Sequence, residues 1–142
     1  MQQATANDLP AVLELLEANK LPTAGVQDHL EHFLLEFAGD ELTACAGLEI
    51  HDCAGLLRSV AVSENHRSTG LGKRLVQAVL EHAKAHHLSS ISLLTETAQD
   101  YFSRLGFQIS TRDALPESLH ASAEFRGACP DSAIAMTLNL EP

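Results

Sequence analysis

Apolar and polar residues alternate along the first half of this chain in the rhythm of extended strands. The stretch "FLLEFAGDELTACAGLEIH" reads as two such segments joined at Gly39 and Asp40, residue types that favour the turn of a β-hairpin. The later run "GLLRSVAV" continues the pattern. Alternation of this kind is typical of strands with one face buried, so these segments predict a common sheet.

Other segments repeat their apolar residues at three- and four-residue steps, which predicts helices. Asn7 or Asp8 can cap a first helix that ends before Pro22, and a short amphipathic segment follows through Val26, Leu30 and Phe33. The longest helix follows a glycine-rich loop. Its expected buried stripe comprises Leu71, Leu75, Val76, Val79, Leu80 and Ala83.

The remaining segments alternate strand and helix. "ISLLT" suits a central strand, "ETAQDYFSRLGF" predicts a helix that ends at Gly106, and "SAIAMTLNL" predicts a last strand. This order indicates an α/β fold, a mixed sheet with helices on its faces. With 142 residues, 45% of them hydrophobic, the chain is expected to form one domain over residues 1–142.

The net charge of the chain limits the classes of partner that it is expected to bind. A net charge of −10 argues against nucleic acid or an anionic membrane as the main partner, because both attract clustered Lys and Arg. No apolar run approaches the roughly 18 residues of a membrane helix, and the N-terminus lacks the features of a signal peptide. We therefore expect a cytoplasmic protein.

Cysteine and histidine residues give no clear metal or disulfide pattern. Cys45, Cys53 and Cys129 are odd in number and form no CxxC motif, which favours free, mostly buried thiols. His82 and His86 have the i, i+4 spacing of two ligands on one helix face. No third ligand is evident beside them, so the sequence predicts solvated histidines and no metal.

The loop within "SVAVSENHRSTGLGKRL" carries the most specific chemistry. Arg67, Gly70 and Gly72 lie between a predicted strand and a predicted helix. The first N–H groups of a helix have no internal partner and attract anions, and Arg67 adds a positive charge beside them. The spacing differs from the P-loop and from the dinucleotide GxGxxG motif. It predicts a pyrophosphate site.

This loop resembles motif A of the GCN5-related N-acetyltransferases, in which Q/R-x-x-G-x-G/A binds the pyrophosphate of acetyl-CoA. "LLRSVAV" and "YFSRLGF" are also similar to segments of that family, whereas Ser68 stands where most relatives have glycine. The resemblance implies a mostly antiparallel sheet with a splayed centre, helices on both faces, and acetyl-CoA as cosubstrate without a metal. It further implies a cofactor site formed by Val60, Ala61, Val62, Arg67, Ser68, Thr69, Gly70, Leu71, Gly72 and Lys73.

A finer resemblance concerns the acceptor. "LPTAGV", "LLTETA" and "EFRGACPDSAIAM" resemble bacterial arsenic-resistance N-acetyltransferases, and "LLRSVAV" and "CPDSA" resemble the acetyltransferase domain of N-acetylglutamate synthases. Both imply a small amine, an amino acid or an arsenical or phosphinic analogue of one. The synthase resemblance implies that Arg58 holds the substrate carboxylate. Glu124 and Arg126 belong to a segment that either covers the substrate mouth or is a solvated loop; Arg126 is a second candidate for substrate binding.

The sequence also offers candidates for the catalytic groups. The family resemblance implies main-chain N–H groups near Val60 and Val62 that polarise the thioester carbonyl, and a tyrosine that protonates the departing thiolate. Tyr101 lies one residue before the usual position, which Phe102 occupies, and one residue turns a helical side chain by about 100°. Tyr101 is thus a candidate acid or a packing residue.

The general base also has several candidates. Glu49, His51 and Glu96 are the choices, and Glu96 is preferred because it lies where a strand leaves the sheet. A base acting through water is equally compatible, and Thr95 or Glu96 can instead cap the next helix. Alternation places Glu49 and His51 on the same strand face.

The favoured hypothesis is that the chain is an acetyl-CoA-dependent N-acetyltransferase, in which the acceptor amine attacks acetyl-CoA directly in a ternary complex. A cofactor-binding module without transferase activity stays open, as does acetylation of a protein N-terminus or lysine. Arsenic binding by the three cysteines is a further reading, although their spacing gives no local chelate. Dimers are common in this fold, which leaves a homodimer open.

Overall fold

The computed structural model describes residues 1–129 and 132–140. Pro130 and Asp131, which belong to the predicted C-terminal motif, lie outside the described residues. The helices are α1 (Leu9–Ala18), α2 (Val26–His29), α3 (Leu71–Ala85) and α4 (Gln99–Arg104). The strands are β1 (Gln2–Gln3), β2 (Phe33–Ala38), β3 (Glu41–His51), β4 (Ala54–Val62), β5 (Ser90–Thr95), β6 (Gln108–Ser110) and β7 (Ile134–Asn139).

Short helical turns connect these elements. Five are 3₁₀ turns: η1 (Ala6–Asp8), η2 (Leu30–His32), η3 (Glu64–His66), η4 (Arg112–Ala114) and η5 (Glu117–Ala121). The last, η6 (Glu124–Ala128), is kinked at Arg126 and Gly127. No helix of the described residues is long and apolar enough to span a membrane.

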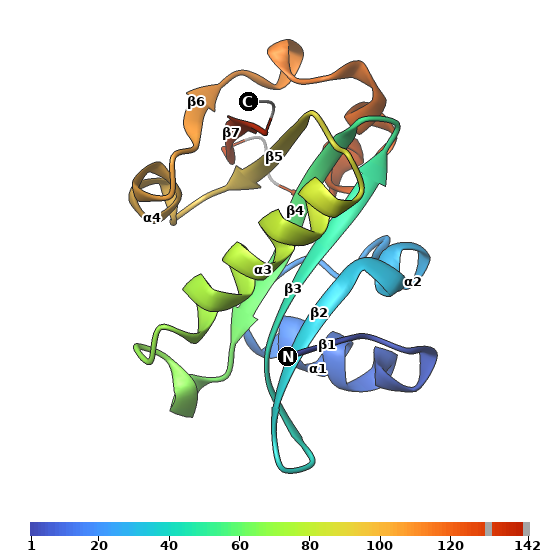
Figure 1. Ribbon diagram of the computed structural model, residues 1–142, viewed down its shortest axis with the longest axis vertical. Coiled ribbons are helices and arrows are strands. Elements are labelled where there is room, and N and C mark those ends of the chain that lie inside the picture. The colour runs from blue at the N-terminus through green and yellow to red at the C-terminus, as the bar shows by residue number, and fades with distance from the viewer. Residues whose placement is uncertain (130–131, 141–142) are drawn as a thin grey trace.

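The strands form one sheet in the order β1-β2-β3-β4-β5-β7-β6 (Figure 1). β4 and β5 are parallel, and every other neighbouring pair is antiparallel. The predicted mixed, mostly antiparallel sheet is confirmed. The hairpin at Gly39 and Asp40 is also present, between β2 and β3.

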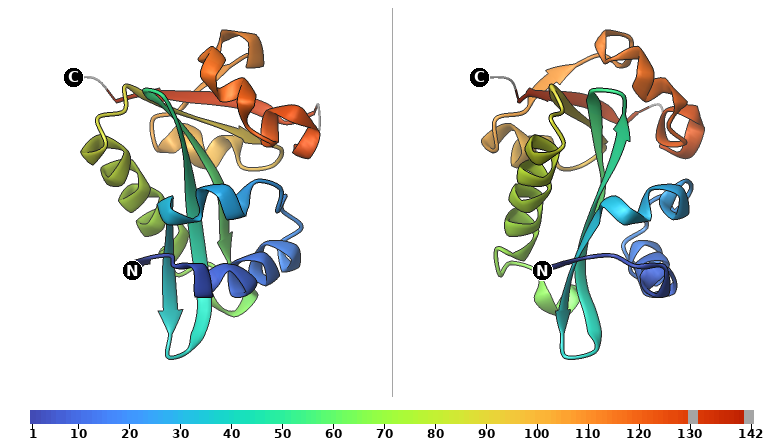
Figure 2. Two further views of the ribbon diagram at one scale, coloured as in Figure 1. Left: turned by 90° about the vertical axis from the view of Figure 1, so that its right-hand side faces the viewer. Right: turned by 45° about the vertical axis from the view of Figure 1, so that its right-hand side comes forward.

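Helices cover both faces of this sheet, as predicted (Figure 2). α3 and α4 lie on one face, and α1 and α2 on the other. Because strand side chains alternate between faces, Leu34 and Leu48 pack toward α3, whereas Phe33 and Leu35 pack toward α1. The predicted stripe on α3 is buried at Leu71, Leu75, Val76, Val79 and Ala83, with Leu80 partly buried.

The sheet opens between β4 and β5. Their pairing covers only Ala54–Leu56 against Ser90–Ser92, so β4 has no partner on that side from Leu57 onward. A β-bulge shifts the register of β4 against β3 just beyond Arg58, and Ser59 has the left-handed φ of +59° there. Bulges bend a strand and increase its twist, which directs the end of β4 away from β5. The splayed centre is confirmed.

Three local predictions differ from the structure. The segment predicted as one helix through Phe33 is split into α2 and η2, and Phe33 begins β2. Asp8 precedes α1 without capping it; its carboxylate accepts a hydrogen bond from the Thr5 N–H at 2.8 Å. β1 and β6 were not predicted, because two or three residues are too few to establish a pattern.

Candidate active site

Two cavities adjoin at the opening of the sheet. The larger, about 560 Å³, lies between the unpaired part of β4, the end of β5 and the residues that follow α1. The smaller, about 310 Å³, lies between the end of β4 and the glycine-rich loop that leads into α3. Val60 and Tyr101 line both. A ligand in one cavity therefore meets a ligand in the other at these two residues.

The glycine-rich loop presents the start of α3 to the smaller cavity. Ser68 and Gly70 have left-handed φ values of +68° and +79°, which turn the chain sharply into the helix. The Arg74 N–H donates to the Gly70 carbonyl at 3.1 Å, so the N–H groups of residues 71–73 precede the first internal bond of the helix. Unpaired N–H groups and the positive end of a helix dipole form a site suited to an anion.

Most residues predicted for the cofactor meet at this cavity. Val60, Val62, Arg67, Ser68, Gly70, Leu71, Gly72 and Lys73 line it. Ala61 does not, because strand alternation turns its side chain into the core beside α1. Thr69 does not either; its hydroxyl donates to the His66 carbonyl at 2.7 Å and supports the loop.

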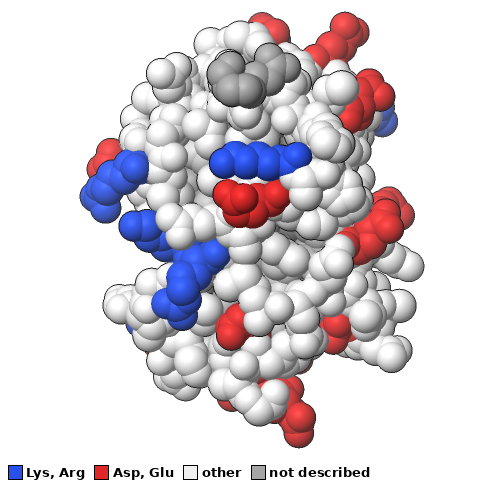
Figure 3. Space-filling model, viewed as in Figure 1, with Lys and Arg blue, Asp and Glu red and all other residues white. Residues whose placement is uncertain are grey.

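Positive charge accompanies the helix start. The Arg67 guanidinium donates to the Asn19 side-chain oxygen at 2.9 Å and to the Val62 carbonyl at 3.3 Å, which ties the loop to the end of α1. Figure 3 shows several Lys and Arg side chains on the left of one face, over α3 and beside α4, while acidic side chains are spread over its top, centre, right edge and bottom. The anion site thus lies on the more basic side of an acidic protein.

The open edge of β4 carries main-chain donors. The Ser63 N–H donates to the Thr43 carbonyl on β3 at 2.7 Å. Since successive N–H groups of a strand point to opposite sides, those of Val62 and Val60 point away from β3, toward the opening. Both residues line the smaller cavity. Their N–H groups are thus placed to donate to a ligand between the strands.

Tyr101 holds a distinctive position on α4. Its hydroxyl is buried, has no hydrogen-bond partner among the described residues, and faces the region shared by both cavities. Burial raises the pKa of Tyr101 above its usual value, so the phenol stays protonated at neutral pH. Phe102, at the position expected for a family tyrosine, is instead buried against Phe107. The unpartnered hydroxyl suits a proton donor to a ligand.

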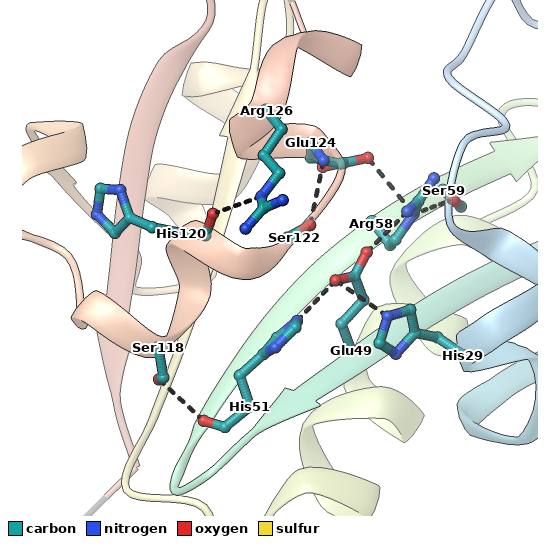
Figure 4. A network of polar contacts seen from close by, with 10 residues as sticks. All are labelled: His29, Glu49, His51, Arg58, Ser59, Ser118, His120, Ser122, Glu124 and Arg126. Carbon is teal, nitrogen blue, oxygen red and sulfur yellow. Dashed lines mark hydrogen bonds and ion pairs between the residues drawn. The ribbon is translucent and has the colours of Figure 1, made fainter.

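Arg58 is the centre of a buried polar network on the wall of the larger cavity (Figure 4). Its Nη1 donates to the Glu49 carboxylate at 2.7 Å, its Nε donates to the Ser59 hydroxyl at 3.0 Å, and its Nη2 donates to the Pro22 carbonyl at 3.2 Å. The Glu124 carboxylate lies 3.4 Å from Nε. These contacts hold the guanidinium in a fixed orientation on the cavity wall.

Glu49 belongs to this network and not to the cavity lining. The prediction that it shares a face with His51 is confirmed, because the His51 Nε2 lies 2.8 Å from its carboxylate. Burial alone would raise the pKa of Glu49, but hydrogen bonds from His51 and Arg58 outweigh burial and lower it. A stabilised carboxylate of this kind is a poor proton acceptor, so Glu49 positions Arg58.

Of the acidic residues that the structure describes, Glu96 and Glu124 face the larger cavity. Glu96 is exposed at its rim, and the neighbouring Thr95 caps the following turn by accepting from the Ala98 N–H at 3.0 Å. Glu124 is only 4% exposed, and burial raises its pKa. The sequence left Glu124 in a segment that either covers the substrate mouth or is a solvated loop. It did not predict the burial of this carboxylate, which depends on η6 bringing Glu124 within 3.4 Å of Arg58 on β4.

The other predicted residues take different positions. Arg126 is exposed and lines neither cavity; its Nε lies 3.5 Å from the His120 carbonyl. Cys45 and Cys129 are buried and Cys53 is exposed, all as free thiols. Burial raises the pKa of Cys45 and of Cys129 to about 12. The cysteines form no joint ligand cluster among the described residues, which argues against arsenic capture.

Comparisons with known proteins agree with this geometry. Residues 5–107 match the model of the acetyltransferase (GNAT) family. Amino-acid acetyltransferases of Neisseria meningitidis and Escherichia coli K12 are 28% and 30% identical to the chain, over 83% of its residues. The chain spans 29% of the length of these relatives.

A solved structure shares the same fold. The N-acetylglutamate synthase of Neisseria gonorrhoeae, complexed with coenzyme A and N-acetyl-glutamate, superposes with a TM-score of 0.83. At 23% identity, the match covers 99% of this chain and 35% of that one. The likeness supports the fold of the chain.

Proposed function

Because the chain belongs to the acetyltransferase (GNAT) family, we propose that it transfers an acetyl group from acetyl-CoA to the amine of a small, amino-acid-like molecule. The observation that carries this proposal is the pair of cavities that share Val60 and Tyr101. The smaller cavity has the N–H donors of an anion site, and the larger cavity has a buried arginine. Two different ligands can therefore meet where the cavities adjoin. Holding both reactants together accounts for much of the rate of such a transfer.

The smaller cavity suits acetyl-CoA, whose pyrophosphate matches the start of α3. The N–H groups of Leu71, Gly72 and Lys73 would donate to the phosphate oxygens, with Arg67 beside them. The N–H groups of Val60 and Val62 would hold the pantetheine arm and polarise the thioester carbonyl. Tyr101 would then protonate the departing thiolate.

The acceptor amine must lose a proton before or during attack. Among the residues that the structure describes, the carboxylates that line the larger cavity are those of Glu96 at its rim and Glu124 on its wall. Glu124 has the more suitable chemistry, because a pKa raised toward neutrality improves a general base. Glu96, the choice from sequence, can serve through a water because the rim is open to solvent.

The larger cavity suits an amino acid. Arg58 and Glu124 present a positive and an acidic group 3.4 Å apart, which complements the carboxylate and amine of one α-amino acid. The related proteins named amino-acid acetyltransferases support this class of acceptor. An arsenical or phosphinic analogue carries a similar charge, so the resemblance to arsenic-resistance enzymes keeps these compounds within the proposal.

A thiol-release assay tests the acceptor. Acetyl-CoA is offered with a panel of amino acids and with arsenical and phosphinic analogues, and acetylated product is identified by mass spectrometry. We expect turnover with one subset of amines that carry an anionic group beside the amine. Binding of acetyl-CoA without turnover of any amine would favour a module without transferase activity, and turnover of peptides alone would favour a protein substrate.

A substitution at Gly72 tests the cofactor cavity. A Cβ at Gly72 would lie 3.5 Å from a Val62 methyl and 4.0 Å from the Tyr101 hydroxyl, so alanine fits, but the added methyl groups of valine enter the cavity. We expect Gly72→Val to raise the KM for acetyl-CoA about tenfold, which corresponds to about 1.4 kcal/mol. Ala85→Val, exposed at the far end of α3, is the control. An unchanged KM would place the cofactor elsewhere.

The cytoplasmic location and the homodimer expected from sequence stay predictions. Fractionation of cells that express the chain tests the first. Sedimentation of the purified chain with and without acetyl-CoA tests the second.

A further inference from the structure

Three histidines from distant parts of the sequence meet at the end of α3 remote from the glycine-rich loop. His82 and His86 lie on one face of that helix, and His32 reaches them from η2. One ring nitrogen of each lies within 4.8 Å of the others, and the His32 Nδ1 is 3.1 Å from the His82 Nε2. The sequence indicated only the pair His82 and His86, and the fold brings His32 to it.

We propose that His32, His82 and His86 bind one divalent transition-metal ion of the zinc class. Zinc binds imidazole nitrogen at about 2.0–2.1 Å, which places two ligands of a tetrahedral site about 3.3 Å apart. The 3.1 Å separation of His32 and His82 already satisfies this spacing. His86 is exposed, so its side chain can rotate the remaining distance.

The chemistry of the cluster favours a metal over a purely hydrogen-bonded group. Imidazole is a preferred ligand of zinc, copper and nickel, and a metal requires its neutral form. Three neutral imidazole rings in contact have few N–H protons with which to form hydrogen bonds to one another. One metal cation can instead accept a lone pair from one nitrogen of each ring.

A carboxylate lies near the ring nitrogen of His32 that faces away from His82. The Glu31 carboxylate lies 3.7 Å from the His32 Nε2, while the Nδ1 faces His82. A carboxylate on the ring nitrogen opposite the metal is a common supporting arrangement, because it fixes the ring and increases its basicity. With three protein ligands, a fourth coordination position stays open to water.

The site is separate from the proposed active site. None of the three histidines lines either cavity. α3 has 15 residues and is therefore about 22 Å long, with the anion site at its start and the cluster near its end. A bound ion would join η2 to α3 and so link the segment before β2 to the helix that covers it.

The test is a zinc titration of the full chain after removal of any histidine tag and treatment with a chelator. We expect one equivalent to bind by calorimetry, and His32→Ala, His82→Ala and His86→Ala each to weaken affinity by at least about tenfold. His87→Asn, one residue beyond the cluster, and His29→Ala, in the other histidine cluster, should bind zinc as the parent does. Cobalt should give an absorption spectrum of nitrogen coordination that the three variants lose.

Several outcomes would overturn the proposal. Parental affinity in His32→Ala would mean that the i, i+4 pair binds alone, and equal weakening in His87→Asn would mean nonspecific binding. If His32→Ala does not fold, ring-nitrogen NMR of the parent chain replaces it. An unchanged His32 signal on addition of zinc would then exclude His32 as a ligand.

Discussion

Replacing Tyr101 with phenylalanine is expected to lower kcat by about a hundredfold or more, the lower range for loss of a positioned proton donor. The reason is that the hydroxyl faces both cavities, and burial keeps its pKa high enough for the phenol to carry a proton. The KM for acetyl-CoA should change little, since the ring remains. Steady-state kinetics on the identified acceptor measure both constants.

The same variant has a built-in control for structural damage. The Tyr101 hydroxyl is buried without a partner among the described residues, so its removal should leave the melting temperature unchanged or raise it. A fall in kcat at constant or higher Tm would therefore identify a chemical role. Full turnover in Tyr101→Phe would remove the tyrosine from the mechanism.

Glu49→Ala is expected to lower the free energy of unfolding by about 3–5 kcal/mol. This is the usual cost of leaving one member of a buried ion pair without its partner. Both side chains of the Glu49–Arg58 pair are fully buried, and Glu49 also contacts His51 and His29. Without its carboxylate, the Arg58 guanidinium loses its shortest contact. Urea denaturation of parent and variant measures the change.

A surface pair provides the matched comparison. Glu81 lies 3.5 Å from Lys84 and is 75% exposed, so Glu81→Ala should cost at most about 1 kcal/mol. A loss in Glu49→Ala no larger than in Glu81→Ala would mean that the buried network contributes little. Activity should fall further in Glu49→Ala than stability alone explains, if Arg58 must be held still to bind the substrate.

The pH dependence has a definite sign. The folded-state pKa of Glu49 is lowered from 4.5, so its contribution to stability is present above that value and is lost as pH falls through the folded pKa. The difference in unfolding free energy between the parent chain and Glu49→Gln should therefore shrink in acid. A constant difference down to pH 3 would contradict the assignment.

Local patterns in the sequence were sufficient for most of the fold. The hairpin of β2 and β3, the long amphipathic α3 and the strand β7 each extend over enough residues for their periodicity to be recognised. β6 has three residues, and its pairing with β7 depends on the chain returning to the sheet. No local pattern encodes that return.

The candidate site, like the fold, could be predicted from the sequence only in part. The glycine loop is contiguous, so its geometry at the start of α3 follows from a short motif. The acidic partners of Arg58 are nine residues away on β3 and 66 residues away in η6, and only the folded chain brings them together. His32 joins His82 across 50 residues for the same reason.

A ligand bound beside the short pairing between β4 and β5 would link the stability of the chain to the supply of that ligand. Three registered residue pairs join the two halves of the sheet. A molecule along the free edge of β4 binds the folded chain and not the unfolded one, so it adds RT ln(1 + [L]/Kd) to the unfolding free energy, about 2.7 kcal/mol at a hundredfold excess over Kd. Amide hydrogen exchange in β5 should slow when the ligand is bound. The supply of the acetyl donor would then affect the lifetime of the protein against proteolysis as well as the rate of acetyl transfer.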